Sequence, residues 1–208
     1  LFGTATGGAY SGGAGATTHT VTATAASTEI ILTNIATGST VNVSGDDDIQ
    51  SIYLDTAAGA TLTLGLGHDQ TDATGDGDIT ILDAADVTIQ SVTATAVFDA
   101  VVLDNTDTTA YTVKTTGSYG LTIGATTGTD AVTSLTSSTA AAAGDITIGV
   151  IANPGALTSL TLTGAAGDIT LGALGSDSAT ATGNSLATID VSSTGGATVT
   201  TGAIYMDM

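Results

Sequence analysis

Residues 157–172 read LTSLTLTGAAGDITLG: two short runs in which aliphatic residues alternate with threonine, joined by a glycine-rich corner. An alternation with a period of two is typical of a β-strand that buries one face and exposes the other. The stretch therefore predicts two short strands separated by a tight bend, with Leu and Ile on the buried face and Thr on the outer face.

Related copies of this unit recur along the chain. Clear copies occupy residues 132–149, 185–202 and 49–65, and weaker ones start at Leu32, Ile89 and Val102. A short repeat of this kind cannot bury its own apolar face and must stack on its neighbours. The repeats therefore predict an elongated fold in which the aliphatic residues of successive units form a continuous core.

The spacing of the copies indicates how the units are connected. Copies begin at residues 132, 157 and 186, so the intervals are 25 and 29 residues. About two dozen residues suit one turn of a parallel β-solenoid, a β-helix-like stack with Gly- and Asp-rich turns. Because the intervals are irregular, an antiparallel β-sandwich is the alternative. Both folds are all-β.

The chain divides into two parts by composition. Residues 1–28 form a Gly/Ala/Thr tract, which we interpret as a flexible arm or as an assembly arm that adds a strand to another subunit. Residues 29–208 form the repeat-built β domain. The chain begins at Leu1 with neither an initiator Met nor a signal peptide, so we expect a processed product or a piece of a longer protein.

Charge narrows the classes of function. The chain has 20 acidic residues against one basic residue, Lys114, and a net charge of −19. Such a surface repels nucleic acid and anionic membranes. No apolar run reaches the roughly 20 residues of a membrane span. Cysteine is absent, which excludes disulfides and thiolate metal sites, and the low Cys, Lys and Arg content fits an extracellular protein.

The acidic residues gather in the expected corners, where several carboxylates would repel one another unless a cation were bound. Hard divalent cations with oxygen ligands, Ca²⁺ above all, fit this chemistry. The predicted calcium ligands are Asp46, Asp47, Asp48, Asp69, Asp72, Asp76, Asp78, Asp104, Asp107, Asp145 and Asp168. The alternative for any single Asp is a solvated turn former.

Three of these residues follow glycine in a repeated Gly-Asp-Ile-Thr motif. They are Asp78, Asp145 and Asp168, and equivalent positions in successive turns would stack about 4.8 Å apart. Either the loops separate such carboxylates or a cation lies between them, and we expect a cation for at least one pair.

Catalysis has little support in the sequence. β-Helix enzymes that act on acidic polysaccharides need Lys or Arg, and this chain has only Lys114. The acids of residues 45–48 and 105–107 superficially resemble the motifs of pectin-hydrolysing enzymes, but in reversed order and without that family's His and basic motifs. His19 and His68 are interpreted as surface residues. We therefore expect a protein that is not an enzyme.

The units LTSLTLTG (residues 157–164) and GDIT (residues 167–170), with the Thr/Ala/Gly/Asp composition, resemble bacterial surface-layer (S-layer) proteins of the type I-secreted, RTX-related kind. This resemblance implies a calcium-stabilised, secreted, cell-surface chain that assembles with its own copies into a lattice or filament. A cell-surface glycan is a further expected partner. The alternatives are a calcium-rigidified repeat module of an adhesin and a polysaccharide-active β-helix enzyme.

Overall fold

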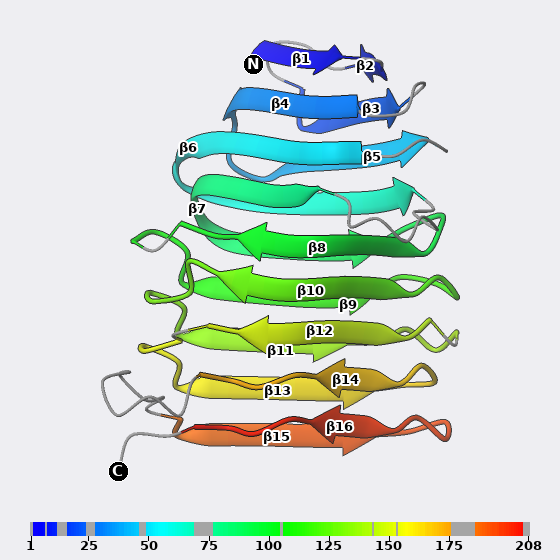
Figure 1. Cartoon of the computed structure of the whole chain (residues 1–208), viewed down its shortest axis with the longest axis vertical. Helices are drawn as coiled ribbons and strands as arrows, with labels where there is room; N and C mark the ends of the chain where they lie inside the picture. Colours follow the sequence, from blue (N-terminus) through cyan, green and yellow to red (C-terminus); the bar gives the residue numbers. More distant parts are fainter. Residues whose placement is uncertain are drawn as a thin grey trace.

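The computed structural model describes residues 2–6, 8–11, 16–23, 28–45, 49–68, 77–104, 106–142, 144–152, 154–175 and 186–205. These residues form a stack of short β-strands that winds from the N-terminal end to the C-terminal end as a solenoid (Figure 1). The strand pairs from β3 onward are parallel, which confirms the predicted parallel β-solenoid and excludes the antiparallel sandwich.

The strands of the described part are β1 (Phe2–Thr6), β2 (Gly8–Ser11), β3 (Thr18–Ala23), β4 (Thr28–Ile35), β5 (Ser39–Gly45), β6 (Ile49–His68), β7 (Asp78–Ser91), β8 (Ala96–Val102), β9 (Ala110–Thr115), β10 (Leu121–Thr127), β11 (Ser134–Ser138), β12 (Ile146–Ile151), β13 (Ser159–Gly164), β14 (Ile169–Leu171), β15 (Thr188–Ser193) and β16 (Val199–Thr201).

Each turn of the solenoid supplies one strand to each of two faces. One face runs β3, β5, the second halves of β6 and β7, and then β9, β11, β13 and β15. The other runs β4, the first halves of β6 and β7, and then β8, β10, β12, β14 and β16. Strands β6 and β7 continue through the bend and so contribute to both faces (Figure 1).

The register confirms the repeats read from the sequence. Leu135 of β11 pairs with Leu160 of β13, which pairs with Ile189 of β15. On the other face Ile146 of β12 pairs with Ile169 of β14. Like positions of the copies that begin at residues 132, 157 and 186 therefore stack directly, as a solenoid requires. The copy at residues 49–65 is in the opposite phase, because its first half lies on the face of β4 and its second half on the face of β5.

Aliphatic columns fill the interior, and threonines cover the outside. Buried Leu and Ile alternate with exposed or partly exposed Thr along several strands, as in residues 61–64. One outer column holds threonine in seven consecutive turns: Thr18, Thr40, Thr63, Thr88, Thr112, Thr136 and Thr161. β-Branched side chains suit such a pleated, half-buried surface.

The strands of the first turn of the solenoid, β1 and β2 (the first rung), run in the direction opposite to the strands on which they pack. Strand β1 pairs antiparallel with β4 and β2 pairs antiparallel with β3, in contrast to the parallel pairs of the later rungs. Residue 28 is the expected boundary of the N-terminal arm. Strands β1 to β3, before this boundary, belong to the same stack as the strands that follow it.

Buried hydroxyls hold the bend that follows the first face. Thr115 Oγ1 donates to the carbonyl of Gly144 and accepts from the amide of Ala140, and Thr139 makes the equivalent pair of bonds one turn later. These bonds satisfy backbone groups that the bend takes out of the sheet ladder.

A column of glycines marks a close approach on the second face. A Cβ added to Gly149 would lie 1.5 Å from the carbonyl oxygen of Gly124, and one added to Gly172 would lie 2.6 Å from that of Gly149. Only glycine fits where consecutive backbones approach this closely.

One sequence expectation about histidine is wrong. His19 of β3 is 1% exposed, because it shares a face with Val21, two residues further along the strand. Burial lowers the pKa of His19. The side chain of His68 lies outside the described residues.

Candidate functional site

The structure brings three carboxylates together at one bend. Asp83 lies between the two halves of β7, and Asp104 and Asp107 lie in the loop that follows β8. One carboxylate oxygen of each residue lies within 4.8 Å of one oxygen of each of the other two, and each side chain is partly exposed. Two of the three, Asp104 and Asp107, belong to the ligand set predicted from the sequence.

The backbone around these carboxylates is held by local hydrogen bonds. The amide and the hydroxyl of Thr106 donate to Asp104 Oδ1 at 2.9 and 2.8 Å. These bonds hold the pKa of the Asp104 carboxyl below its ordinary value, and the backbone amides of Asp83 and Asp107 act in the same direction. Asp83 has a φ of 62°, a left-handed conformation that Asp tolerates better than most residues.

Three carboxylates at one bend offer the ligand chemistry of a hard cation. Ca²⁺ takes six to eight oxygen ligands, so the remaining ligands at this bend would be backbone carbonyls or water. Asp83 was not among the predicted ligands. The sequence does place it close to another acid, Asp86, but its position opposite Asp104 follows only from the register of β7 on β8.

Asp145 and Asp168 do stack, but each carboxylate is paired with backbone. Asp145 Oδ1 accepts from the amide of Asp168 at 2.8 Å, and Asp168 Oδ1 accepts from the amide of Thr198 at 2.7 Å. Each carboxylate therefore accepts a hydrogen bond from the next turn. The Gly-Asp-Ile-Thr motif thus has a structural role in addition to the predicted binding of a cation between Asp145 and Asp168.

Asp78 does not belong to the same column, contrary to the sequence interpretation. It pairs with Ala100 of β8, in the column that continues through Ala125. Asp145 instead precedes Ile146, whose column contains Leu121 and Ala96. The identical Gly-Asp-Ile-Thr motif thus begins at different points along the face. The other predicted ligands, Asp46, Asp47, Asp48, Asp69, Asp72 and Asp76, lie outside the described residues.

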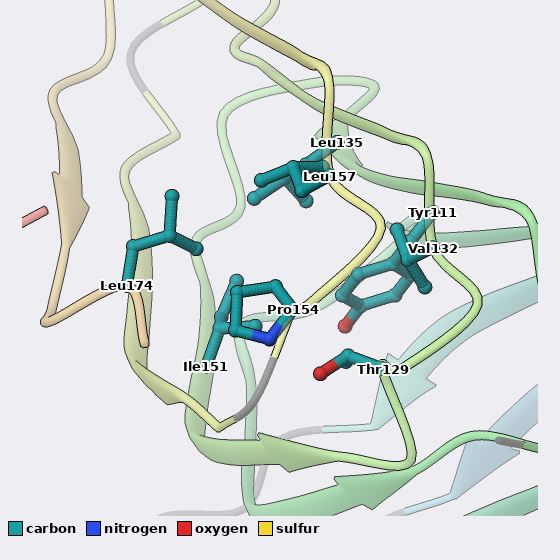
Figure 2. Close-up of a pocket in the computed structure, with 8 residues that line it drawn as sticks. All are labelled: Tyr111, Thr129, Val132, Leu135, Ile151, Pro154, Leu157 and Leu174. Carbon is teal, nitrogen blue, oxygen red and sulfur yellow. The ribbon is translucent and has the colours of Figure 1, made fainter. Parts of the chain in front are cut away.

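A small gap lies inside the stack on the same side as the three carboxylates, at the bends that follow β10 and β12. Its volume is about 10 Å³, close to the minimum for a single water molecule. Figure 2 shows the lining residues, with the Tyr111 hydroxyl directed toward Thr129 and the remaining side chains apolar. The gap contains no carboxylate and is too small for an organic ligand.

Tyr111 is a buried polar group beside this gap. Its side chain is 1% exposed, and burial raises the pKa of its hydroxyl. The neighbouring Thr126 hydroxyl is also buried, and neither oxygen has a partner in good hydrogen-bonding geometry within the described chain.

The last rung is open. Ile189 and Val191 of β15 are 51% and 50% exposed, whereas Leu160 and Leu162, the residues they pair with in β13, are fully buried. Among the described strands, β15 pairs only with β13 and β16 only with β14. The stack thus presents two strand edges and half-exposed aliphatic residues at this end.

The described residues include no helix that is long and apolar enough to cross a membrane. Comparison of the chain with known protein families, curated protein sequences and solved structures gives no match.

Proposed function

We propose that this chain is a structural, self-assembling extracellular protein, a subunit of a surface layer or filament that is stabilised by calcium. The observation that carries the proposal is the open last rung. Ile189 and Val191 occupy inward-facing positions whose equivalents one turn earlier are completely buried.

An exposed strand edge with inward aliphatic residues recruits another strand. Unpaired N–H and C=O groups are a template for pairing, and soluble proteins usually blunt such edges with charge, proline or a covering loop. Strand β15 has no proline and one charged residue, Asp190. In repeat proteins the terminal repeats carry a polar face toward solvent that keeps the stack soluble, whereas the inward positions of β15 hold the half-exposed Ile189 and Val191.

The high negative charge of the chain is the reason to include calcium in the proposal. A net charge of −19 makes copies repel one another and strains the folded chain, and bound cations relieve both effects. The cluster of Asp83, Asp104 and Asp107 is the described group best suited to a divalent cation. A cation there would join β7 to the loop after β8 and so stiffen the contact between two turns.

Electron microscopy and sedimentation of the purified chain, with Ca²⁺ and with a chelator, test the proposal. We expect ordered assemblies with Ca²⁺ and fewer or none with chelator. A chain that stays monomeric in both conditions would refute self-assembly, and a monomer stiffened by Ca²⁺ would favour the adhesin module instead.

The metal site has its own variant test. Asp104→Asn combined with Asp107→Asn should abolish most of the rise in melting temperature that Ca²⁺ produces. Asp99→Asn, which removes one exposed carboxylate from the middle of β8, is the control and should leave that rise intact. Equal behaviour of the two variants would place the calcium effect outside this cluster.

A further inference from the structure

The two ends of the chain are nearly free of charge, unlike the rest. Residues 1–28 contain no Asp, Glu, Lys or Arg, and residues 186–205 contain only Asp190. The remaining acids lie at residues 29–177, apart from Asp207. Copies of so acidic a chain repel each other through their flanks. The ends are therefore the surfaces at which two copies meet with the least electrostatic cost.

Both ends also present a pair of strand edges, one on each face. At the N-terminal end β1 pairs only with β4, and β2 pairs with β3, among the described strands. At the C-terminal end the edges belong to β15 and β16. Figure 1 places the two pairs at opposite ends of the stack. A single extended peptide could cover one edge, whereas another rung of the same width covers both.

Strand direction determines what a joint between these ends looks like. All pairs from β3 to β15 are parallel, so β15 runs in the direction of β3, while β2 runs in the opposite direction. The same holds on the other face, where β16 runs with β4 and against β1.

We propose that copies join head to tail, with β15 of one copy antiparallel to β2 of the next and β16 antiparallel to β1. This inference rests on the proposed self-assembly and specifies its contact. The reversed first rung makes the joint antiparallel although the body of each copy is parallel. Such a contact uses different surfaces on the two copies and does not close on itself, so it builds a filament.

Charge favours this arrangement over the tail-to-tail one. A tail-to-tail joint would bring the Asp190 carboxylates of two copies to a single strand interface, and like charges across paired strands are destabilising. A head-to-tail joint instead places Asp190 beside a strand from the uncharged N-terminal segment. It also covers Ile189 and Val191, which are half-exposed in the single chain.

The absence of cysteine allows a direct test with introduced thiols. Ser192→Cys places a thiol on the outer face of β15, and Ala9→Cys places one on β2 at the position paired with Thr22. The two single variants are assembled alone and mixed, then treated with a flexible bifunctional thiol cross-linker that tolerates a shift in register. Thr147→Cys, on the outer face of β12 in mid-stack, replaces Ser192→Cys in the control mixture.

Head-to-tail joining predicts cross-linked dimers in the mixture of Ser192→Cys with Ala9→Cys, in several-fold excess over either variant alone and over the control mixture. Strong cross-linking of Ser192→Cys alone would overturn the proposal in favour of tail-to-tail contacts. Strong cross-linking of Ala9→Cys alone would overturn it in favour of head-to-head contacts. If the unmodified chain assembles but the mixture gives no excess, the joint is wrong and the proposed function stands. If the unmodified chain does not assemble at all, both fail.

Discussion

The two halves of the solenoid share one backbone plan but differ in the number of acidic residues that they carry. Glu29 and thirteen aspartates lie within residues 29–107, whereas residues 131–205 contain four acids. In the second half, Asp145, Asp168 and Thr139 bond directly to backbone groups of the next turn. In the first half, Asp83 joins two other carboxylates at a single bend. Hydroxyl bonds between turns occur in both halves, as in the bond from Thr108 Oγ1 to the carbonyl of Ala84. The comparison therefore indicates that acids of the second half accept hydrogen bonds from the next turn, and that a bound cation would contribute most in the first half.

The largest effect is expected at the glycine column of the second half. Gly149→Ala should destabilise the fold by about 3 kcal/mol or more, because the new Cβ would overlap the Gly124 carbonyl and force two strands apart. Gly117→Ala is the control, since a Cβ there meets no atom closer than 4.0 Å. Denaturant unfolding of both variants provides the measurement, and similar stabilities would mean that the turns can separate freely at this point.

The next test compares the interior with the open end, within one column. Leu160→Ala should cost about 2–5 kcal/mol because it leaves a cavity in the core. Ile189→Ala should cost only about 1 kcal/mol in the dilute single chain, because roughly half of its side chain stays in water. Unfolding under conditions that prevent assembly gives both values. Equal costs would mean that another part of the chain covers the last rung.

Removing a carboxylate that accepts a hydrogen bond from the next turn should have a smaller effect, and its dependence on Ca²⁺ tests the difference between the two halves. Asp145→Ala leaves the Asp168 amide without its acceptor and should cost about 1 kcal/mol, the same with Ca²⁺ as with chelator. Asp145→Asn keeps an acceptor oxygen and should cost less. A destabilisation by Asp145→Ala that appears only when Ca²⁺ is present would show that the second half also depends on the ion.

The smallest effect concerns pH at the N-terminal end. Burial lowers the pKa of His19 in the folded chain, so the unfolded chain takes up a proton first as pH falls. Stability from this group is complete above the ordinary value of about 6.5 and decreases as pH falls below it. The melting temperature should be measured between pH 7.5 and 5 for the parent chain and for His19→Gln. We expect it to fall less steeply with decreasing pH in the variant than in the parent chain. Parallel profiles would exclude His19 as the source.

The fold could be predicted from the sequence because its two signals are strong and independent. Alternation fixed which side of each strand is buried, and spacing near one turn favoured parallel stacking. Leu135, Leu160 and Ile189 could be aligned by eye, and they form one column. The same alternation could have predicted that His19 is buried, because it lies two residues before Val21 and so faces the same side of the strand. Its threonine neighbours suggested an exposed run instead.

The candidate site was less predictable because register, not motif, decides which side chains meet. The motif at residues 77–80 is identical to those at 144–147 and 167–170, yet Asp78 lies in another column because β7 pairs with the later part of β8. Asp83 has no motif of its own and meets Asp104 only through the winding of the chain. Neither fact can be derived from composition or from the local sequence.

The nearest-neighbour pairing of the rungs also has a mechanical consequence. Tension along the stack axis pulls on successive rung interfaces in series, so the weakest interface yields first and sets the breaking load. Tension along the strands instead shears many backbone hydrogen bonds at once. The protein should therefore be soft along its length and stiff across its width, and any filament built from it would rupture at whichever rung contact is weakest.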